Sequence, residues 1–160
     1  MYIFIVLNIL DFGNVNKKWF ETIVRYDKTM ESGKVKKVSE TYVVDAITFG
    51  EAEESITREM RHFIDGDFEV KNINPAPYSE IFFSDKDTDD KYYRVKLAFI
   101  TIDEKTQKEK KSKVAYLVQA GSLEQARKNT EEVMNGTMID YEFVSVTETK
   151  IFDVFEQKGK

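Results

Sequence analysis

The feature that most constrains this chain is an internal repeat. The segment YVVDAITFGEA, from Tyr42 to Ala52, reappears as YLVQAGSLEQA from Tyr116 to Ala126, so that position 42 corresponds to position 116. A repeat of this kind indicates that one supersecondary unit occurs more than once and that neighbouring copies bury each other's apolar faces. The sequence therefore predicts two copies of one unit related by a pseudo-two-fold axis.

The first copy, residues 19–83, contains three stretches with the alternation of half-buried strands and one helix. The strands are predicted at about 20–26, 36–46 and 68–82. Thr48 is a predicted N-cap with Glu51 completing a capping box, and Gly66 is placed to end the helix. Pro75 and Pro77 interrupt the third strand, which places it at an edge, a bulge or a bend.

The second copy, residues 92–156, repeats the same order, with Ser122 and Gln125 as its capping box and Asn135-Gly136 as its stop. One such unit has a single helix and cannot cover its own sheet, whereas two copies can pair their sheets or form a continuous one. The predicted fold is α+β: a tandem duplicated β-β-α-β unit with a largely antiparallel sheet, two helices and a pseudo-two-fold. Residues 84–91 form the linker and residues 1–18 an N-terminal apolar extension.

Composition excludes several classes of protein. The 160 residues contain no cysteine, which excludes disulfides, thiolate catalysis and cysteine-based zinc sites, and the net charge of -5 argues against blanket attraction to nucleic acid or membrane. Met1–Leu10 is apolar but lacks the basic start of a signal peptide and is too short to span a bilayer. We expect an extra edge strand or an upstream stretch there, a cytoplasmic chain and no membrane partner.

Motifs for catalysis or metal binding fail on inspection. The linker run Asp85–Asp90 resembles the start of a calcium loop, but the positions that require glycine and glutamate hold Asp90 and Lys96, so a solvated linker is predicted. His62 is the only histidine and lies near a helix C-terminus, where a cation is favourable. No phosphate-binding glycine loop occurs. We expect a non-enzyme without metal or cofactor.

A doubled basic signal is the most suggestive chemistry. Each predicted hairpin is rich in lysine, and Lys37 aligns with Lys111 across the repeat. Two basic arms on an acidic protein could flank a ligand that carries phosphates. Lysine on exposed strands also blocks edge-to-edge aggregation, which is the structural alternative. The hairpin lysines are Lys28, Lys34, Lys36 and Lys37 in the first copy and Lys105, Lys108, Lys110, Lys111 and Lys113 in the second.

Several segments together resemble a known family: the opening Trp19-Phe20-Glu21, the strand Tyr42–Ala46 with its following helix, and a second copy that continues to Phe155. The chain is similar, over about residues 19–155, to domain-of-unknown-function family 4494 of Bacteroidetes and their phages. That resemblance implies a cytoplasmic protein encoded by a phage or mobile element and acting by binding. It assigns no role to any residue.

We hypothesise a non-enzymatic binding protein that sequesters or senses an anionic, nucleotide-like small ligand at the junction between the copies or between subunits. Aligned lysines would contact phosphate as point charges, an arginine on a neighbouring strand would bind it bidentately, and an aromatic residue at the start of a copy would stack on a base. The predicted ligand-binding residues are Trp19, Arg25, Lys37, Tyr92, Arg94 and Lys111.

Two alternatives stay open. The same sheet could bind single-stranded nucleic acid, which requires affinity that falls with salt. The chain could instead be a protein–protein interaction module that docks on a host or phage partner through Met1–Leu10 or through a sheet edge. A homodimer or higher oligomer is compatible with each hypothesis.

Overall fold

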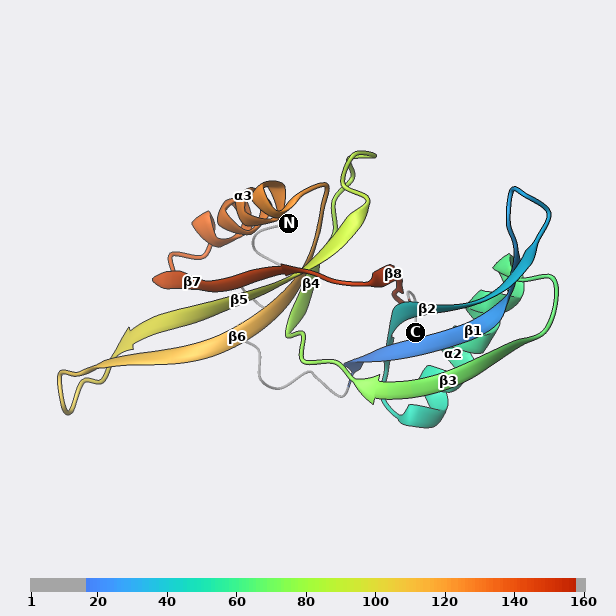
Figure 1. Cartoon of the computed structure of the whole chain (residues 1–160). Helices are drawn as coiled ribbons and strands as arrows, with labels where there is room; N and C mark the ends of the chain where they lie inside the picture. The colour runs from blue at the N-terminus through green and yellow to red at the C-terminus, as the bar shows by residue number, and fades with distance from the viewer. Residues whose placement is uncertain (1–16, 158–160) are drawn as a thin grey trace. The chain divides into compact units, whose positions relative to one another are not determined.

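The computed structural model describes residues 17–157 and contains, within them, eight strands and two helices (Figure 1). The predicted N-terminal extension, residues 1–18, therefore lies outside the described residues except for its last two positions. The helices are α2 (Phe49–Phe63) and α3 (Leu123–Asn135). The strands are β1 (Lys18–Thr29), β2 (Val35–Ala46), β3 (Phe68–Pro75), β4 (Glu80–Phe82), β5 (Lys91–Ile102), β6 (Glu109–Ala120), β7 (Tyr141–Glu148) and β8 (Ile151–Phe155).

The strands form two separate four-stranded sheets, ordered β3-β1-β2-β8 and β4-β6-β5-β7. A long antiparallel hairpin is central in each, β1–β2 in one and β5–β6 in the other. A third strand pairs antiparallel with the first, and a short strand lies parallel to the second. The prediction of an α+β fold with two helices and mostly antiparallel pairing is confirmed, and the sheet is divided in two.

The short parallel strands belong to the sheet of the other half of the sequence. β4 follows β3 in the chain but pairs with β6, and β8 follows β7 but pairs with β2. The compact units are consequently residues 17–76 with 150–157, here the α2 unit, and residues 77–149, here the α3 unit. They do not coincide with the predicted repeats at 19–83 and 92–156, because β4 pairs with β6 and β8 pairs with β2.

Both helices begin as the capping pattern predicts. Thr48 accepts a hydrogen bond through Oγ1 from the backbone N–H of Glu51 at 3.1 Å, and Ser122 Oγ accepts one from Gln125 at 3.1 Å. A side-chain oxygen at the N-cap satisfies one of the first free N–H groups of a helix. Ala52 and Ala126 follow the caps at matching positions and are fully buried against their own sheets.

A similar hydrogen bond forms just after each of the two short parallel strands, β4 and β8. The backbone N–H of Gln157, just after β8, donates to Asp45 Oδ1 at 2.8 Å, and that of Ser84, just after β4, donates to Gln119 Oε1 at 2.9 Å. Asp45 and Gln119 occupy the same position in the aligned segments.

No helix among the described residues is long and apolar enough to cross a membrane.

Candidate functional site

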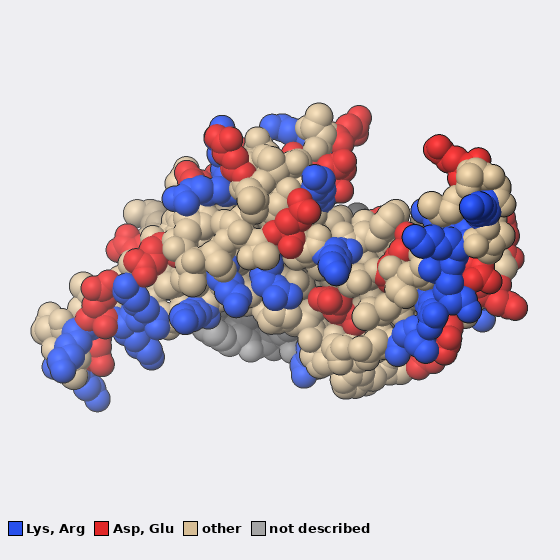
Figure 2. All heavy atoms as spheres, viewed as in Figure 1, with Lys and Arg blue, Asp and Glu red and all other residues tan. Residues whose placement is uncertain are grey.

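The β1–β2 hairpin extends beyond the part of its sheet that α2 covers, and this arm, residues 25–39, is strongly basic. Burial along β1 stops after Val24 and resumes along β2 at Tyr42. The arm contains five Lys or Arg residues and two Asp or Glu residues, a net of three positive charges on a chain of net charge -5. Figure 2 shows Lys and Arg side chains gathered over this hairpin. We call residues 25–39 the α2-unit arm.

Arg25 and Lys37 lie together on the face of the α2-unit arm that points away from α2. The register pairs Arg25 with Ser39 and Lys37 with Asp27, so the Cα atoms of Arg25 and Lys37 are diagonal neighbours about 7–8 Å apart. Both side chains are exposed, and no ion pair to either is present within residues 17–157. Of the predicted residues, these two are brought together.

Trp19 is on the same face as Arg25 but at the other end of β1. Six residues separate them, which is about 20 Å along a strand. Trp19 is also half-buried. A mononucleotide held by Arg25 and Lys37 would therefore not reach Trp19, and the predicted stacking role does not combine with these phosphate contacts.

In the α3 unit, the predicted aromatic residue is in the interior. Tyr92 is 4% exposed, so its ring offers no open face for a base. We therefore do not retain Tyr92 among the proposed ligand-binding residues. Arg94 lies 5.6 Å from the ring centre of Tyr78 and donates to the Tyr78 hydroxyl at 3.3 Å. The guanidinium of Arg94 therefore already contacts another side chain. Arg94 lies near the start of β5, away from the β5–β6 turn.

Lys111 lies in the corresponding α3-unit arm, residues 98–113, but it has a carboxylate partner. Its Nζ is 2.8 Å from Glu142 Oε1, and the hydrogen bond to Glu142 raises the pKa of the Lys111 ammonium. The α3-unit arm contains five Lys and three acidic residues, a net of two positive charges. Acidic and basic side chains alternate over this end of β5–β6 in Figure 2.

Most of the acidic linker is exposed, as the sequence predicts, but Asp89 is an exception. Asp89 is 4% exposed, and its Oδ2 accepts from Ser84 Oγ at 2.6 Å and from Asn129 Nδ2 at 3.3 Å. The side chains of Ser84 and of Asn129 on α3 satisfy this carboxylate, which charge composition alone does not indicate. Within residues 17–157 there is no group of three or more His, Cys, Asp or Glu residues that could hold a metal ion.

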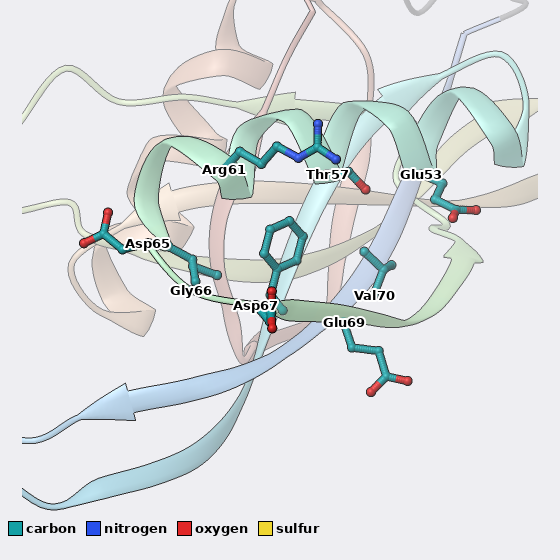
Figure 3. A pocket seen from close by; sticks show the side chains of 10 residues that line it. Glu53, Thr57, Arg61, Asp65, Gly66, Asp67, Glu69 and Val70 are labelled. Carbon is teal, nitrogen blue, oxygen red and sulfur yellow. The ribbon is translucent and has the colours of Figure 1, made fainter.

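An open groove of about 670 Å³ lies between α2 and the edge strand β3, and sequence reasoning missed it (Figure 3). Glu53, Thr57 and Arg61 recur every four residues along one side of α2, a spacing that was the available signal. The half-buried apolar residues of the groove are Ile64, Phe68 and Val70. We call it the α2–β3 groove.

These features define a class: a small α+β protein with two sheets, two basic hairpin arms and a groove beside a sheet edge. The chain matches the family described as domain of unknown function DUF4494 over residues 18–157, and it belongs to that family. Comparison with curated proteins and with solved structures gave no match.

Proposed function

We propose that this protein is a non-enzymatic binding protein for a phosphate-bearing ligand, held by its basic hairpin arms. The observation that carries the proposal is the charge of the α2-unit arm, three net positive charges concentrated on an acidic chain. Lys28 and Lys36 face each other directly across the hairpin. Like charges placed opposite are destabilising, and a bound polyanion removes that cost.

The open surface favours an extended ligand over an enclosed one. Arg25 and Lys37 are exposed on a sheet face, whereas small-molecule sites are usually concave and bury most of their ligand. We therefore put single-stranded nucleic acid ahead of a nucleotide-like small molecule. Contacts would be to the phosphate backbone, because lysines act as point charges without reading bases.

Fluorescence anisotropy with a labelled single-stranded oligonucleotide tests the proposal, with ATP as the competing small ligand. We expect affinity that falls steeply with added salt, because each phosphate contact releases a counterion. Substituting Lys37→Glu together with Lys111→Glu should weaken binding by about tenfold or more. Lys128→Glu with Lys150→Glu makes the same change of charge outside the arms and is the matched control.

Three results would count against this assignment. Unchanged affinity in the Lys37→Glu, Lys111→Glu protein would exclude the arms. An equal loss in the control protein would indicate a response to net charge only. Competition by ATP at low concentration, without dependence on strand length, would favour the small nucleotide-like ligand.

We also propose that the two units arose by tandem duplication and are related by a pseudo-two-fold, which would give paired sites. The matching strand orders and the matching N-caps support this. An origin in Bacteroidetes or their phages, a cytoplasmic location and assembly into a homodimer or higher oligomer are parts of the same proposal.

A further inference from the structure

At the corresponding place in the α3 unit, between its helix and its edge strand, an arginine contacts an aromatic ring. Edge strand β7 lies beside α3 as β3 lies beside α2. The guanidinium of Arg127 is 4.4 Å from the ring centre of Phe143 on β7, and its Nε is 3.1 Å from Glu131 Oε1. In the α3 unit, an exposed arginine of the helix therefore lies over an aromatic ring of the edge strand and pairs with a carboxylate.

The α2 unit has different side chains at the same three positions. Position 53, five residues after its N-cap as 127 is after its own, holds Glu53 in place of Arg127. Thr57 stands where the α3 unit has Glu131. Val70, the third residue of β3, stands where β7 has Phe143. The α2 unit therefore has a carboxylate where the α3 unit has an arginine, and smaller side chains at the other two positions.

Only the first part of β3 is suited to pair with an added strand. It is the terminal strand of its sheet, with β1 on one side. Lys71, Pro75 and a register shift opposite Ile23 and Val24 lie in its second part, and such features block strand addition. The first three residues, 68–70, have none of them. In Figure 3, Val70 points toward α2 while Glu69 points away from it.

We propose that the α2–β3 groove binds an extended segment of a partner protein that presents an arginine between apolar residues. The segment pairs with the backbone of residues 68–70, and its arginine lies over Phe68 and Val70 and pairs with Glu53. The charges of the groove match this partner, since Glu53, Asp65 and Asp67 line it with a single cation, Arg61. Addition of a strand at an edge beside a helix is an established mode of peptide recognition. The groove adjoins the α2-unit arm, because Arg25 pairs with Glu69 and Tyr26 with Phe68 in the sheet, but Arg25 and Lys37 lie on the face that points away from α2.

The probe is a blocked pentapeptide, Thr-Val-Arg-Val-Thr, added to the full chain and followed by two-dimensional amide NMR. We expect saturable shifts at Thr57 and residues 68–70. The peptide with citrulline in place of arginine is neutral but nearly isosteric, and it should bind about tenfold more weakly because the charge-assisted pair is lost. The double substitution Glu53→Arg, Thr57→Glu introduces the arginine–glutamate pair of the α3 unit at the groove and should abolish the shifts.

Glu54→Arg is the control, because it makes the same Glu→Arg charge reversal on α2 outside the groove, without the carboxylate that Thr57→Glu adds. It should alter the affinity by no more than about twofold, as expected for an exposed charge. The proposal is overturned by absence of saturable shifts at millimolar peptide, by equal binding of the citrulline peptide, or by an equal loss in Glu54→Arg. A peptide-free dimer whose interface protects residues 68–70 would give the groove to a second copy and would also overturn it.

Discussion

The α2 and α3 units have the same strand order and equivalent helix caps, yet several of their exposed side chains differ in kind or in partner. Arg127 contacts the Phe143 ring in the α3 unit, whereas Glu53 has that position beside the open α2–β3 groove. Lys111 is paired with Glu142, while Lys37 has no ion pair among the described residues. The shared positions are those that build a sheet covered by one helix. The differing positions are therefore where the two units can acquire separate binding roles.

The largest difference expected in stability is at the position after the second strand of each unit. It is Ile47, 52% exposed, in the α2 unit and Gly121 in the α3 unit. A Cβ at Gly121 would lie 2.5 Å from the carbonyl oxygen of Thr88, which is backbone and cannot move aside easily. Gly121→Ala should lower the free energy of unfolding by about 2 kcal/mol, measured by denaturant titration with far-UV circular dichroism.

Gly50→Ala is the control for that experiment. Its nearest contact would be Thr48 Oγ1 at 4.0 Å, and alanine is the better helix former, so we expect a gain of about 0.5 kcal/mol. Trp19 is the only tryptophan and lies in the α2 unit, so its fluorescence reports that unit. A Gly121→Ala protein with unchanged stability would show that the Thr88 loop moves freely and that the glycine is not required.

A smaller difference is expected at the aligned tyrosines Tyr42 and Tyr116, both buried. The Tyr42 hydroxyl donates to Glu40 Oε1 at 3.0 Å, whereas the Tyr116 hydroxyl has no hydrogen-bond partner within residues 17–157. Tyr42→Phe should lower the free energy of unfolding by about 1 kcal/mol, and Tyr116→Phe should leave it unchanged or raise it by up to about 1 kcal/mol. Equal losses at the two sites, in paired thermal or denaturant melts, would contradict this comparison.

The smallest effect is a dependence on alkaline pH at Tyr26 and Tyr42 of the α2 unit. Burial, with the hydrogen bond to Glu40, raises the pKa of Tyr26 from 10.0 to about 12, and burial also raises the pKa of Tyr42. A tyrosine whose pKa is raised by folding contributes stability that is complete below pH 10.0 and is lost as pH rises through about 12. Trp19 fluorescence melts should show that decline.

Glu40→Gln removes the charge that contributes to both shifts, so the decline between pH 10.0 and about 12 should become shallower. Burial also raises the pKa values of Tyr93 and Tyr116 in the α3 unit, but these tyrosines are common to both proteins. A decline of identical slope in the two proteins would assign the alkaline loss to groups outside the Tyr26, Tyr42 and Glu40 cluster.

Much of the local structure follows from sequence, because its causes are local. A cap such as Thr48 needs only the N–H groups of the next three residues, and strand alternation needs only the chain's own pleat. The two helices, their starts and the edge position of β3 were predictable for this reason. Arg25 and Lys37 were also correctly expected on one hairpin, since hairpin partners are close in sequence.

The errors concern side chains whose surroundings come from distant parts of the chain. Alternation assigns Tyr92 to one face of its strand, but it does not say whether that face is covered, and Tyr92 is buried. From its sequence neighbours, Asp89 is expected to be a solvated linker residue. In the fold it accepts hydrogen bonds from Ser84 and from Asn129 of α3. The α2–β3 groove is open because Thr57 and Val70 are small at positions that meet only in the fold.

The sequence by itself determined the repeat, the two capped helices, the long hairpins and the basic charge of their arms, because each depends on residues near one another in the chain. Tertiary structure alone decided that β4 and β8 join the sheet of the other half, since parallel pairing with β6 or β2 is a non-local choice between equivalent edges. It also decided which groove stays open, because that depends on the volumes of side chains from two separate elements.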